Sequence, residues 1–461
     1  MKRQSLTPRD DLILDLFIHD TIDRSADAIR LCNVINSVEG SYSIAINGAW
    51  GSGKTVYIKQ AKILLDYLNG TLSSEPLLSE QIDFFIGATP HFNELLQKKN
   101  NVKTIYYDAW ENDNDIDPVL SIIFSIINSG QFSLKEKPTH DIGSILSSIA
   151  EIISGRNVTA FFQAAKGENF LSGIKQQKSV RELTNDFFQN MIRSGEERIA
   201  IFIDELDRCK PTYAITLLER IKHYFDNENL VFIFSINLDQ LQHTVKSYYG
   251  IEFDACRYLD KFFDLVIQLP PYNNEKFLNN IGFKESAYIS RKVSRAVIKS
   301  LNLQMREQEK FIQLVKISGL ERLTQKISTS FSDDRAYFFA MAYVLPLILG
   351  LQIVNIKDYN DFINGTNFAP LVSLLNNLDV RMLDRSGLLN ENETFLSSRD
   401  NKSGLKQVAV NEVASSLSRI LFRNNYELEY QQTIGSMTFS KEVRNELLRN
   451  ACLLSKYTEY E

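Results

Sequence analysis

The sequence has few of the residues that form disulfides or bind transition metals. Only four cysteines and five histidines occur among its 461 residues. The histidines are isolated, and no cysteine pair has CxxC spacing: the four are Cys32, Cys209, Cys256 and Cys452. This pattern excludes a zinc site recognisable by its spacing, and it is typical of free thiols in a reducing cytoplasm.

An excess of positive charge is also missing. Lysine and arginine total 51 against 57 acidic residues, which gives a net charge of −6. Nucleic-acid binding is therefore possible but not indicated by a global basic field. Acidic residues interrupt the apolar part of the N-terminal stretch MKRQSLTPRDDLILDLFIHD, which argues against a signal peptide. The apolar content of 44% is ordinary for a globular protein, and the length indicates two or three domains.

One long uncharged run stands out, AYFFAMAYVLPLILGLQIV at 336–354. It is nearly long enough to span a bilayer, and a helix buried on all sides would have the same composition. Pro346, Gly350 and Gln352 interrupt it, and its flanks carry no positive bias. These features favour a buried core helix over a membrane span.

A glycine-rich octet, GAWGSGKT, fits the pattern G-x-x-x-x-G-K-[ST]. An apolar strand-like stretch, SYSIAIN, precedes it, and the amphipathic helical stretch TVYIKQAKILLDYL follows. Strand, glycine loop and helix in this order predict a P-loop that holds a phosphate chain with backbone N–H groups. The predicted nucleotide-binding residues are Gly48, Ala49, Trp50, Gly51, Ser52, Gly53, Lys54, Thr55 and Val56, with Lys54 neutralising the β- and γ-phosphates.

A second motif, RIAIFIDELDRC at 198–209, indicates what happens to the nucleotide. Five apolar residues predict a buried strand, and Asp204 and Glu205 follow at its carboxyl end. Asp204 is expected to hold Mg²⁺ together with the Thr55 hydroxyl, and Glu205 to act as general base towards water. A purely structural role for Glu205 is the alternative, but the acidic pair after a P-loop favours hydrolysis over binding alone.

A third predicted strand lies in NLVFIFSINLDQL and becomes polar at Ser235 and Asn237. Its tip could reach the γ-phosphate or the attacking water, the role known as sensor 1. We assign this role to Asn237, with a strand-end turn as the alternative.

These motifs, taken in order, resemble the KAP family of P-loop NTPases. The resemblance covers about residues 6–365. It rests on the blocks DRSADAIRLCNVI, GAWGSGKT, TIYYDAWENDNDIDPV, IFIDELDRC, YLDKFFDLVIQLPP and LNLQMREQEKFI. The family includes a plasmid-encoded phage-exclusion protein and a neuronal membrane scaffold.

The resemblance implies further site residues. Arg306 matches an arginine that can act as sensor 2, and Arg208, Arg257 and Arg306 are competing candidates for the arginine that stabilises transition-state charge. Each of the three could instead be a salt-bridge residue. Trp110 of the Asp-Ala-Trp signature is expected to be a core aromatic near the site, with direct ligand contact as the alternative. Many members carry two membrane-spanning helices between the Walker motifs; the insertion here lacks such runs, so it resembles a soluble branch.

The predicted fold class is α/β, a P-loop NTPase parallel sheet sandwiched by helices. We predict an ATPase core at 1–270 with a helical insertion near 120–180, a helical lid-like subdomain at 271–365, and a helical C-terminal region at 366–461.

The predicted function is that of a cytoplasmic, Mg²⁺-dependent ATPase that couples ATP turnover to conformational change in a multiprotein assembly. Self-association and partner proteins are expected, and membrane contact is not. The phage-exclusion relative suggests bacterial antiviral defence. A nucleotide-gated scaffold with negligible turnover is the main alternative; a P-loop kinase or GTPase is less favoured because no N-K-x-D guanine motif occurs.

Overall fold

The chain folds into two compact units, Met1–Lys276 and Phe277–Glu461. The structure, a computed structural model, describes residues 10–70, 82, 102–115, 117–129, 180–191, 198–225, 227–325, 332–379, 382–383, 386–390, 393–395, 406–422 and 432–453. Most of the predicted insertion, residues 130–179, lies outside these ranges. The predicted lid-like subdomain and C-terminal region both fall almost wholly within the second unit.

The first unit is built on a five-stranded sheet in the order β2-β3-β4-β1-β5. All four strand pairings are parallel. The strands are β1 (Tyr42–Asn47), β2 (Val102–Asp108), β3 (Arg198–Asp204), β4 (Leu230–Ile236) and β5 (Leu265–Gln268). This parallel sheet confirms the predicted α/β class.

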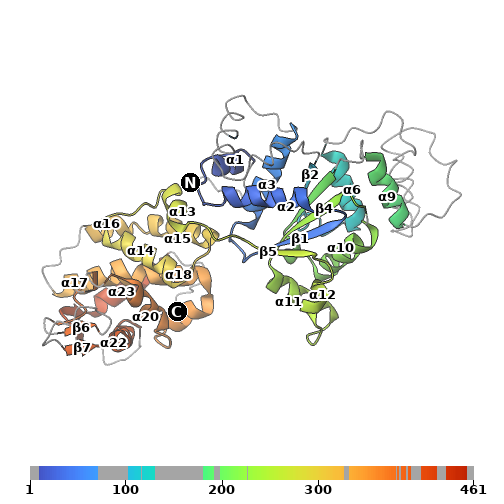
Figure 1. Cartoon of the computed structure of the whole chain (residues 1–461). Coiled ribbons are helices and arrows are strands. Elements are labelled where there is room, and N and C mark those ends of the chain that lie inside the picture. The colour runs from blue at the N-terminus through green and yellow to red at the C-terminus, as the bar shows by residue number, and fades with distance from the viewer. Residues whose placement is uncertain are drawn as a thin grey trace. The chain divides into compact units, whose positions relative to one another are not determined.

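Helices cover both faces of this sheet (Figure 1). One apolar cluster joins the sheet to α1 (Asp10–Ile18), α2 (Ser25–Ser37) and α3 (Lys54–Leu68). A second cluster joins the opposite face to α6 (Pro118–Asn128), α9 (Val180–Met191), α10 (Pro211–Tyr224), α11 (Leu238–Tyr249) and α12 (Ala255–Leu259). The short 3₁₀ turn η1 (Leu206–Arg208) follows β3.

The central strands are apolar because both of their faces are covered. Residues 199–203 of β3 are fully buried, as expected for a strand inside a parallel sheet. The carboxyl ends of β1, β3 and β4 lie at one edge, since neighbouring strands are parallel and in register. Ligands of open α/β sheets bind at this edge.

The second unit is mainly helical. Its helices are α13 (Asn274–Asn280, which begins in the first unit), α14 (Ile289–Ser300), α15 (Met305–Ile317), α16 (Leu320–Gln325), α17 (Ser332–Phe339), η2 (Ala340–Val344), α18 (Leu345–Val354), α19 (Ile356–Ile363), α20 (Ala369–Asn377), α22 (Val410–Phe422) and α23 (Lys441–Leu453). The sequence did not predict its two short strand pairs, β6 (Glu393–Phe395) with β7 (Lys406–Val408) and β8 (Gln432–Ile434) with β9 (Met437–Phe439).

The long apolar run forms one continuous helical stretch through α17, η2 and α18. Among the described residues, Asp333–Val354 is the helix long and apolar enough to cross a membrane, yet 72% of its most apolar window is buried. The core helix of a globular domain has the same properties, as the buried-helix interpretation predicted.

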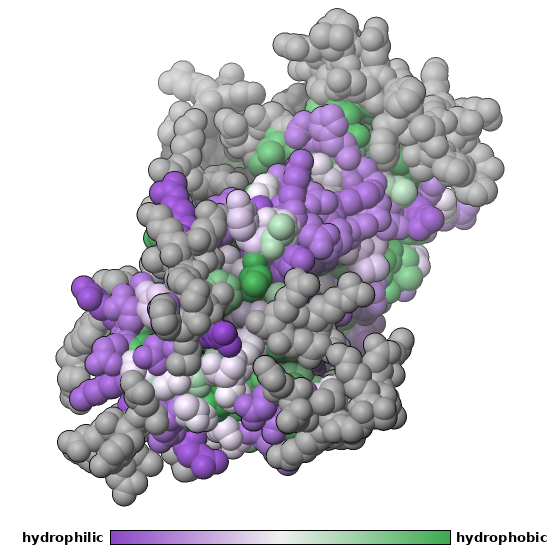
Figure 2. Space-filling model, turned by 90° about the vertical axis from the view of Figure 1, so that its left-hand side faces the viewer, coloured by the Kyte–Doolittle hydropathy of each residue, from purple (hydrophilic) through white to green (hydrophobic). Residues whose placement is uncertain are grey.

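On the face in Figure 2, green hydrophobic residues of the described surface form small separate patches among purple and white ones.

The helix widens where proline interrupts its hydrogen bonds. Pro346 has no N–H to donate to the carbonyl of Ala342, and the preceding turn, Ala340–Val344, is a π-helix. A π-bulge beside a proline is a common way for a buried helix to adjust.

Gly350 allows α18 to approach α14 closely. A Cβ atom at this position would lie 2.7 Å from Leu301 Cδ1 and 2.8 Å from Val297 Cγ1, closer than side chains normally pack. We therefore expect Gly350→Val to lower the free energy of unfolding by about 1–3 kcal/mol through overpacking. Chemical denaturation of the full chain measures this effect. Val354→Ala on the same helix, where the side chain is 42% exposed, is the control, and equal loss in both variants would contradict the packing argument.

Candidate functional site

The glycine loop connects the end of β1 to the start of α3, as the strand–loop–helix pattern predicted. Gly51 and Gly53 have φ values of 76° and 88°, a left-handed region that favours glycine. Backbone in this conformation turns successive N–H groups inward and forms a concave anion-binding nest. Thr55 and Val56 follow in the first turn of α3, where the helix dipole also favours an anion.

Lys54 lies inside the loop. Its side chain is 8% exposed, and Nζ donates to the carbonyl oxygens of Gly48 (2.7 Å) and Ala49 (3.2 Å). Burial lowers the pKa of Lys54, while the carboxylates of Asp207 and Asp204 oppose this shift. The ammonium group is thus desolvated, held by the carbonyl groups of the glycine loop, and close to acidic groups.

Asp204 ends β3 and is 1% exposed. Its Oδ2 accepts a hydrogen bond from the Tyr106 hydroxyl (2.9 Å), and its Oδ1 accepts from the backbone N–H of Glu205 (3.0 Å). In register, Asp204 lies between Asp108 of β2 and Ser235 of β4, so these three side chains point to one face of the sheet. That face is the one covered by α3, the helix that carries Thr55.

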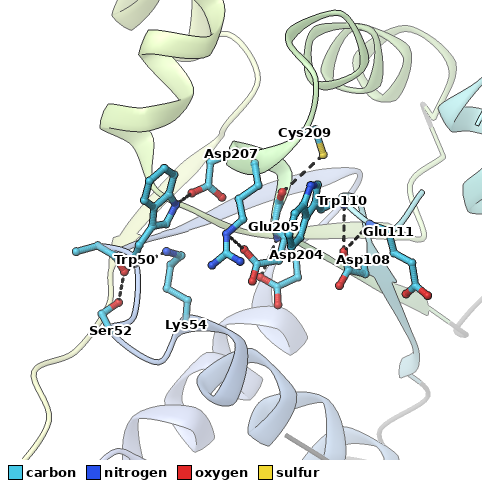
Figure 3. Close-up of polar contacts among 12 residues, drawn as sticks. Trp50, Ser52, Lys54, Asp108, Trp110, Glu111, Asp204, Glu205, Asp207 and Cys209 are labelled. Atoms are coloured by element: carbon cyan, nitrogen blue, oxygen red, sulfur yellow. Dashed lines mark hydrogen bonds and ion pairs between the residues drawn. The ribbon is translucent and has the colours of Figure 1, made fainter. Parts of the chain in front are cut away.

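Glu205 has an unusual backbone conformation. Its φ is 59° and its ψ 23°, a left-handed geometry that costs a non-glycine residue about 1–3 kcal/mol and is concentrated at functional sites. Burial, reinforced by the adjacent Asp204 carboxylate, raises the pKa of Glu205 to about 7. Arg208 opposes the shift through an ion pair in which its Nε lies 2.6 Å from Glu205 Oε2. Figure 3 shows Glu205 and Asp204 on the side of the site across from Trp50.

Two tryptophans border this site (Figure 3). Trp50 of the glycine loop is 45% exposed, and its Nε1 donates to Asp207 Oδ2 at 2.5 Å. Trp110 is 50% exposed, and the guanidinium of Arg208 lies 5.6 Å from its ring centre. The prediction that Trp110 is a core aromatic is therefore wrong. Asp108 accepts the backbone N–H of Trp110 at 3.0 Å, and the resulting turn leaves the indole half exposed.

Asn237 adopts the alternative that the sequence left open, a strand-end turn. Its side-chain oxygen accepts from the N–H of Gln240 at 3.3 Å and caps α11. Ser235 is the polar residue of β4 that lies level with Asp204, and it is fully buried. Its Oγ has no hydrogen-bond partner among the described residues. Ser235 is thus better placed than Asn237 to meet a ligand beside Asp204.

The candidate arginines lie in different places. Arg208 is in the site and is paired with Glu205. Arg257 lies exposed on α12 of the first unit, and Arg306 lies on α15 of the second unit. The structure brings Lys54, Asp204 and Arg208 close to Glu205, and the charges of these three groups act on the pKa of Glu205.

The donor set suits a magnesium nucleotide. Mg²⁺ prefers one or two carboxylates and completes its shell with waters and phosphate oxygens. Asp204, with the hydroxyl of Thr55 on the facing helix, provides such hard oxygen donors. No cluster of three or more His, Cys, Asp or Glu that could hold a metal ion occurs within the described ranges.

The glycine loop and the acidic strand end both lie within a segment whose sequence matches a known family. The sequence model of the KAP family P-loop domain matches residues 24–331. The chain belongs to the KAP family. No curated protein matches it at a significant level. Among solved structures, the Aeropyrum pernix ORC1 protein in complex with DNA is similar at 14% identity with a TM-score of 0.30, over 87% of this chain and 83% of that one.

The contacts of three residues in this KAP domain's site were not predicted from the sequence. Tyr106 contacts Asp204, Asp207 contacts Trp50, and Arg24 contacts the loop carbonyl of Ser52. All three residues stand in blocks that carry the family resemblance, but nothing in their spacing indicates these contacts. Knowledge of the strand order would have been needed to place Tyr106 beside Asp204.

Proposed function

We propose that this KAP domain hydrolyses ATP with Mg²⁺ as cofactor. The observation that carries the proposal is the placement of Glu205 beside Asp204 at the carboxyl end of β3, in electrostatic contact with Lys54 of the glycine loop. A binding protein needs the loop and a metal ligand. A second, separately oriented carboxylate with a pKa raised to about 7 is what proton abstraction from water requires.

Each residue then has a chemical task. The loop N–H groups and Lys54 bind the phosphate chain, and Asp204 and Thr55 hold the cation. When bound, Mg²⁺ neutralises phosphate charge. Glu205 orients the attacking water and accepts its proton. Ser235, buried and level with Asp204, is placed to hydrogen-bond to that water or to a terminal phosphate oxygen.

One contact favours a second candidate function, a nucleotide-gated scaffold with negligible turnover. One oxygen of the Glu205 carboxylate, Oε2, is engaged by Arg208 Nε at 2.6 Å in this conformation. An ion pair of this kind stabilises the charged carboxylate and makes it a weaker base towards water. If Arg208 keeps this contact when nucleotide is bound, the domain binds nucleotide with little turnover.

Steady-state phosphate release by the full chain separates these functions, with ATP and GTP compared and Mg²⁺ present or omitted. We expect Mg²⁺-dependent release with ATP preferred. Tight ATP binding with no release above background would support the scaffold. A preference for GTP would contradict the nucleotide assignment.

ATP energy is proposed to drive conformational change in an assembly located in the cytoplasm. P-loop ATPases related to AAA+ proteins often receive an arginine from a neighbouring subunit, and the exposed Arg257 is available for this task. We therefore expect self-association that ATP strengthens. Sedimentation of the Glu205→Gln variant with and without ATP tests it, and a monomer in both conditions would contradict it.

The biological setting we propose is bacterial defence against phage, in which partner proteins carry the effector chemistry. Its support is the resemblance to the phage-exclusion relative. A plaque assay on bacteria that carry the complete gene neighbourhood tests this proposal. Protection that persists unchanged in Lys54→Ala would show that nucleotide binding does not arm the system.

A further inference from the structure

Arg24 is a buried cation next to the glycine loop. It immediately precedes α2 and is 2% exposed. Burial lowers its pKa to about 10, so it remains charged at neutral pH. No carboxylate lies within ion-pair distance of its guanidinium in the part of the chain that the structure describes. Burying a charge without such a partner lowers the stability of the fold, which favours a functional role for Arg24.

The guanidinium of Arg24 is directed at the loop backbone. Its Nη1 donates to the carbonyl oxygen of Ser52 at 2.7 Å, in buried surroundings. The ring of Tyr272 lies 5.4 Å from the guanidinium carbon, and Nε has no hydrogen-bond partner among the described residues. A charge-assisted hydrogen bond of this kind is about twice as strong as a neutral one, so it fixes the direction of the carbonyl.

The direction of this carbonyl determines the direction of an N–H group. The peptide bond between Ser52 and Gly53 is trans, so its C=O and N–H groups point in opposite directions. With the Ser52 oxygen held by Arg24, the Gly53 N–H points away from Arg24. Gly53 is the N-cap of α3, and its N–H is therefore one of the donors at the positive end of that helix.

The turn that carries Arg24 is itself held in place. Asp20 and Asp23 have φ values of 45° and 62°, which for non-glycine residues persist only where the surroundings fix them. Asp20 accepts the N–H of Ser25 at 3.1 Å. The ammonium group of Lys276 contacts both aspartates, at 3.2 Å and 2.5 Å. These contacts hold the turn that carries Arg24 in one conformation beside the glycine loop.

We propose that Arg24 is a positioning residue for phosphate binding, which keeps the Ser52–Gly53 peptide turned so that the Gly53 N–H faces the phosphate chain. This inference rests on the proposed nucleotide binding. Arg24 acts through the backbone of the loop and does not itself contact the nucleotide base or ribose.

The test is isothermal titration of the full chain with two ligands, ATP and inorganic pyrophosphate. Arg24→Met keeps the volume of the side chain but removes the charge and the donor. We expect this substitution to weaken the binding of both ligands by about ten-fold or more, because one charge-assisted hydrogen bond that orders the site is lost. Arg24→Lys keeps the charge without the planar fork, so it should recover part of the affinity for both ligands.

The control is Arg30→Met on α2, where the arginine is exposed and pairs with Asp27. Its affinity for both ligands should equal that of the wild type. Thermal unfolding without ligand identifies which variants fold. In any folded Arg24 variant, wild-type affinity for pyrophosphate would overturn the proposal. Weaker binding of ATP with unchanged binding of pyrophosphate would also overturn the proposal, because that result would place Arg24 at the base or ribose. Failure of the wild type to bind either ligand would instead contradict the proposed function.

Discussion

Lys54→Ala is expected to abolish ATP binding at concentrations that saturate the wild type. The ammonium group of Lys54 is already desolvated within the loop, so its attraction to a phosphate chain is not reduced by surrounding water. Loss of the two charge-assisted hydrogen bonds that we expect between this group and phosphate oxygens corresponds to ATP binding about 100-fold weaker or more. Equilibrium titration with ATP measures this change directly.

The same substitution has a structural side effect that needs a control. Without the ammonium group, the carbonyl oxygens of Gly48 and Ala49 lose their donor. The thermal midpoint of Lys54→Ala without nucleotide shows whether the loop still folds. Lys222→Ala on α10, at an exposed position, should bind ATP like the wild type. Undiminished affinity in a folded Lys54→Ala would show that this loop does not bind phosphate through its lysine.

The Glu205→Gln variant should still bind ATP but should lose ATP hydrolysis. Glutamine has nearly the shape of glutamate and can still orient a water molecule, but it cannot accept a proton. General-base catalysis contributes about 10²–10⁴-fold, so phosphate release should fall by that factor. ATP affinity should stay within a few-fold of the wild-type value or increase, because the repulsion between this carboxylate and the phosphates is removed.

The measurement pairs phosphate release with ATP titration on the same preparation. Glu228→Gln, an exposed position in the turn before β4, is the matched control and should have wild-type turnover. Turnover at the wild-type rate in Glu205→Gln would mean that another group takes the proton. Loss of both binding and turnover would point instead to a structural role, in which the ion pair with Arg208 holds the end of β3 in place.

Much of the nucleotide-binding core was predictable from local patterns. The apolar run before the glycine loop, the buried run before Asp204 and the apolar run before Ser235 became β1, β3 and β4. Each has a one-dimensional signature, because a strand covered on both faces must be apolar along its length. The strand order was not predictable from these patterns, since every buried parallel strand looks alike in sequence.

The parts of the site that were missed depend on contacts between distant residues. The bond from Arg24 to Ser52 joins positions 28 residues apart, and that from Trp50 to Asp207 joins positions 157 apart. Such pairs leave no periodicity in one sequence. Trp110 was misplaced for a related reason: hydrophobicity alone predicts burial, whereas the turn formed by Asp108 after β2 leaves the indole half exposed.

The positions of Trp50 and Trp110 have a practical consequence for work in solution. They are the only two tryptophans of the chain, and both border the same site. One indole is hydrogen-bonded to a carboxylate and the other lies near a guanidinium group, and both are half exposed to water. Indole emission depends on these surroundings. Intrinsic fluorescence excited outside the tyrosine band is therefore a label-free optical reporter of this one site, present in the natural chain without any added dye.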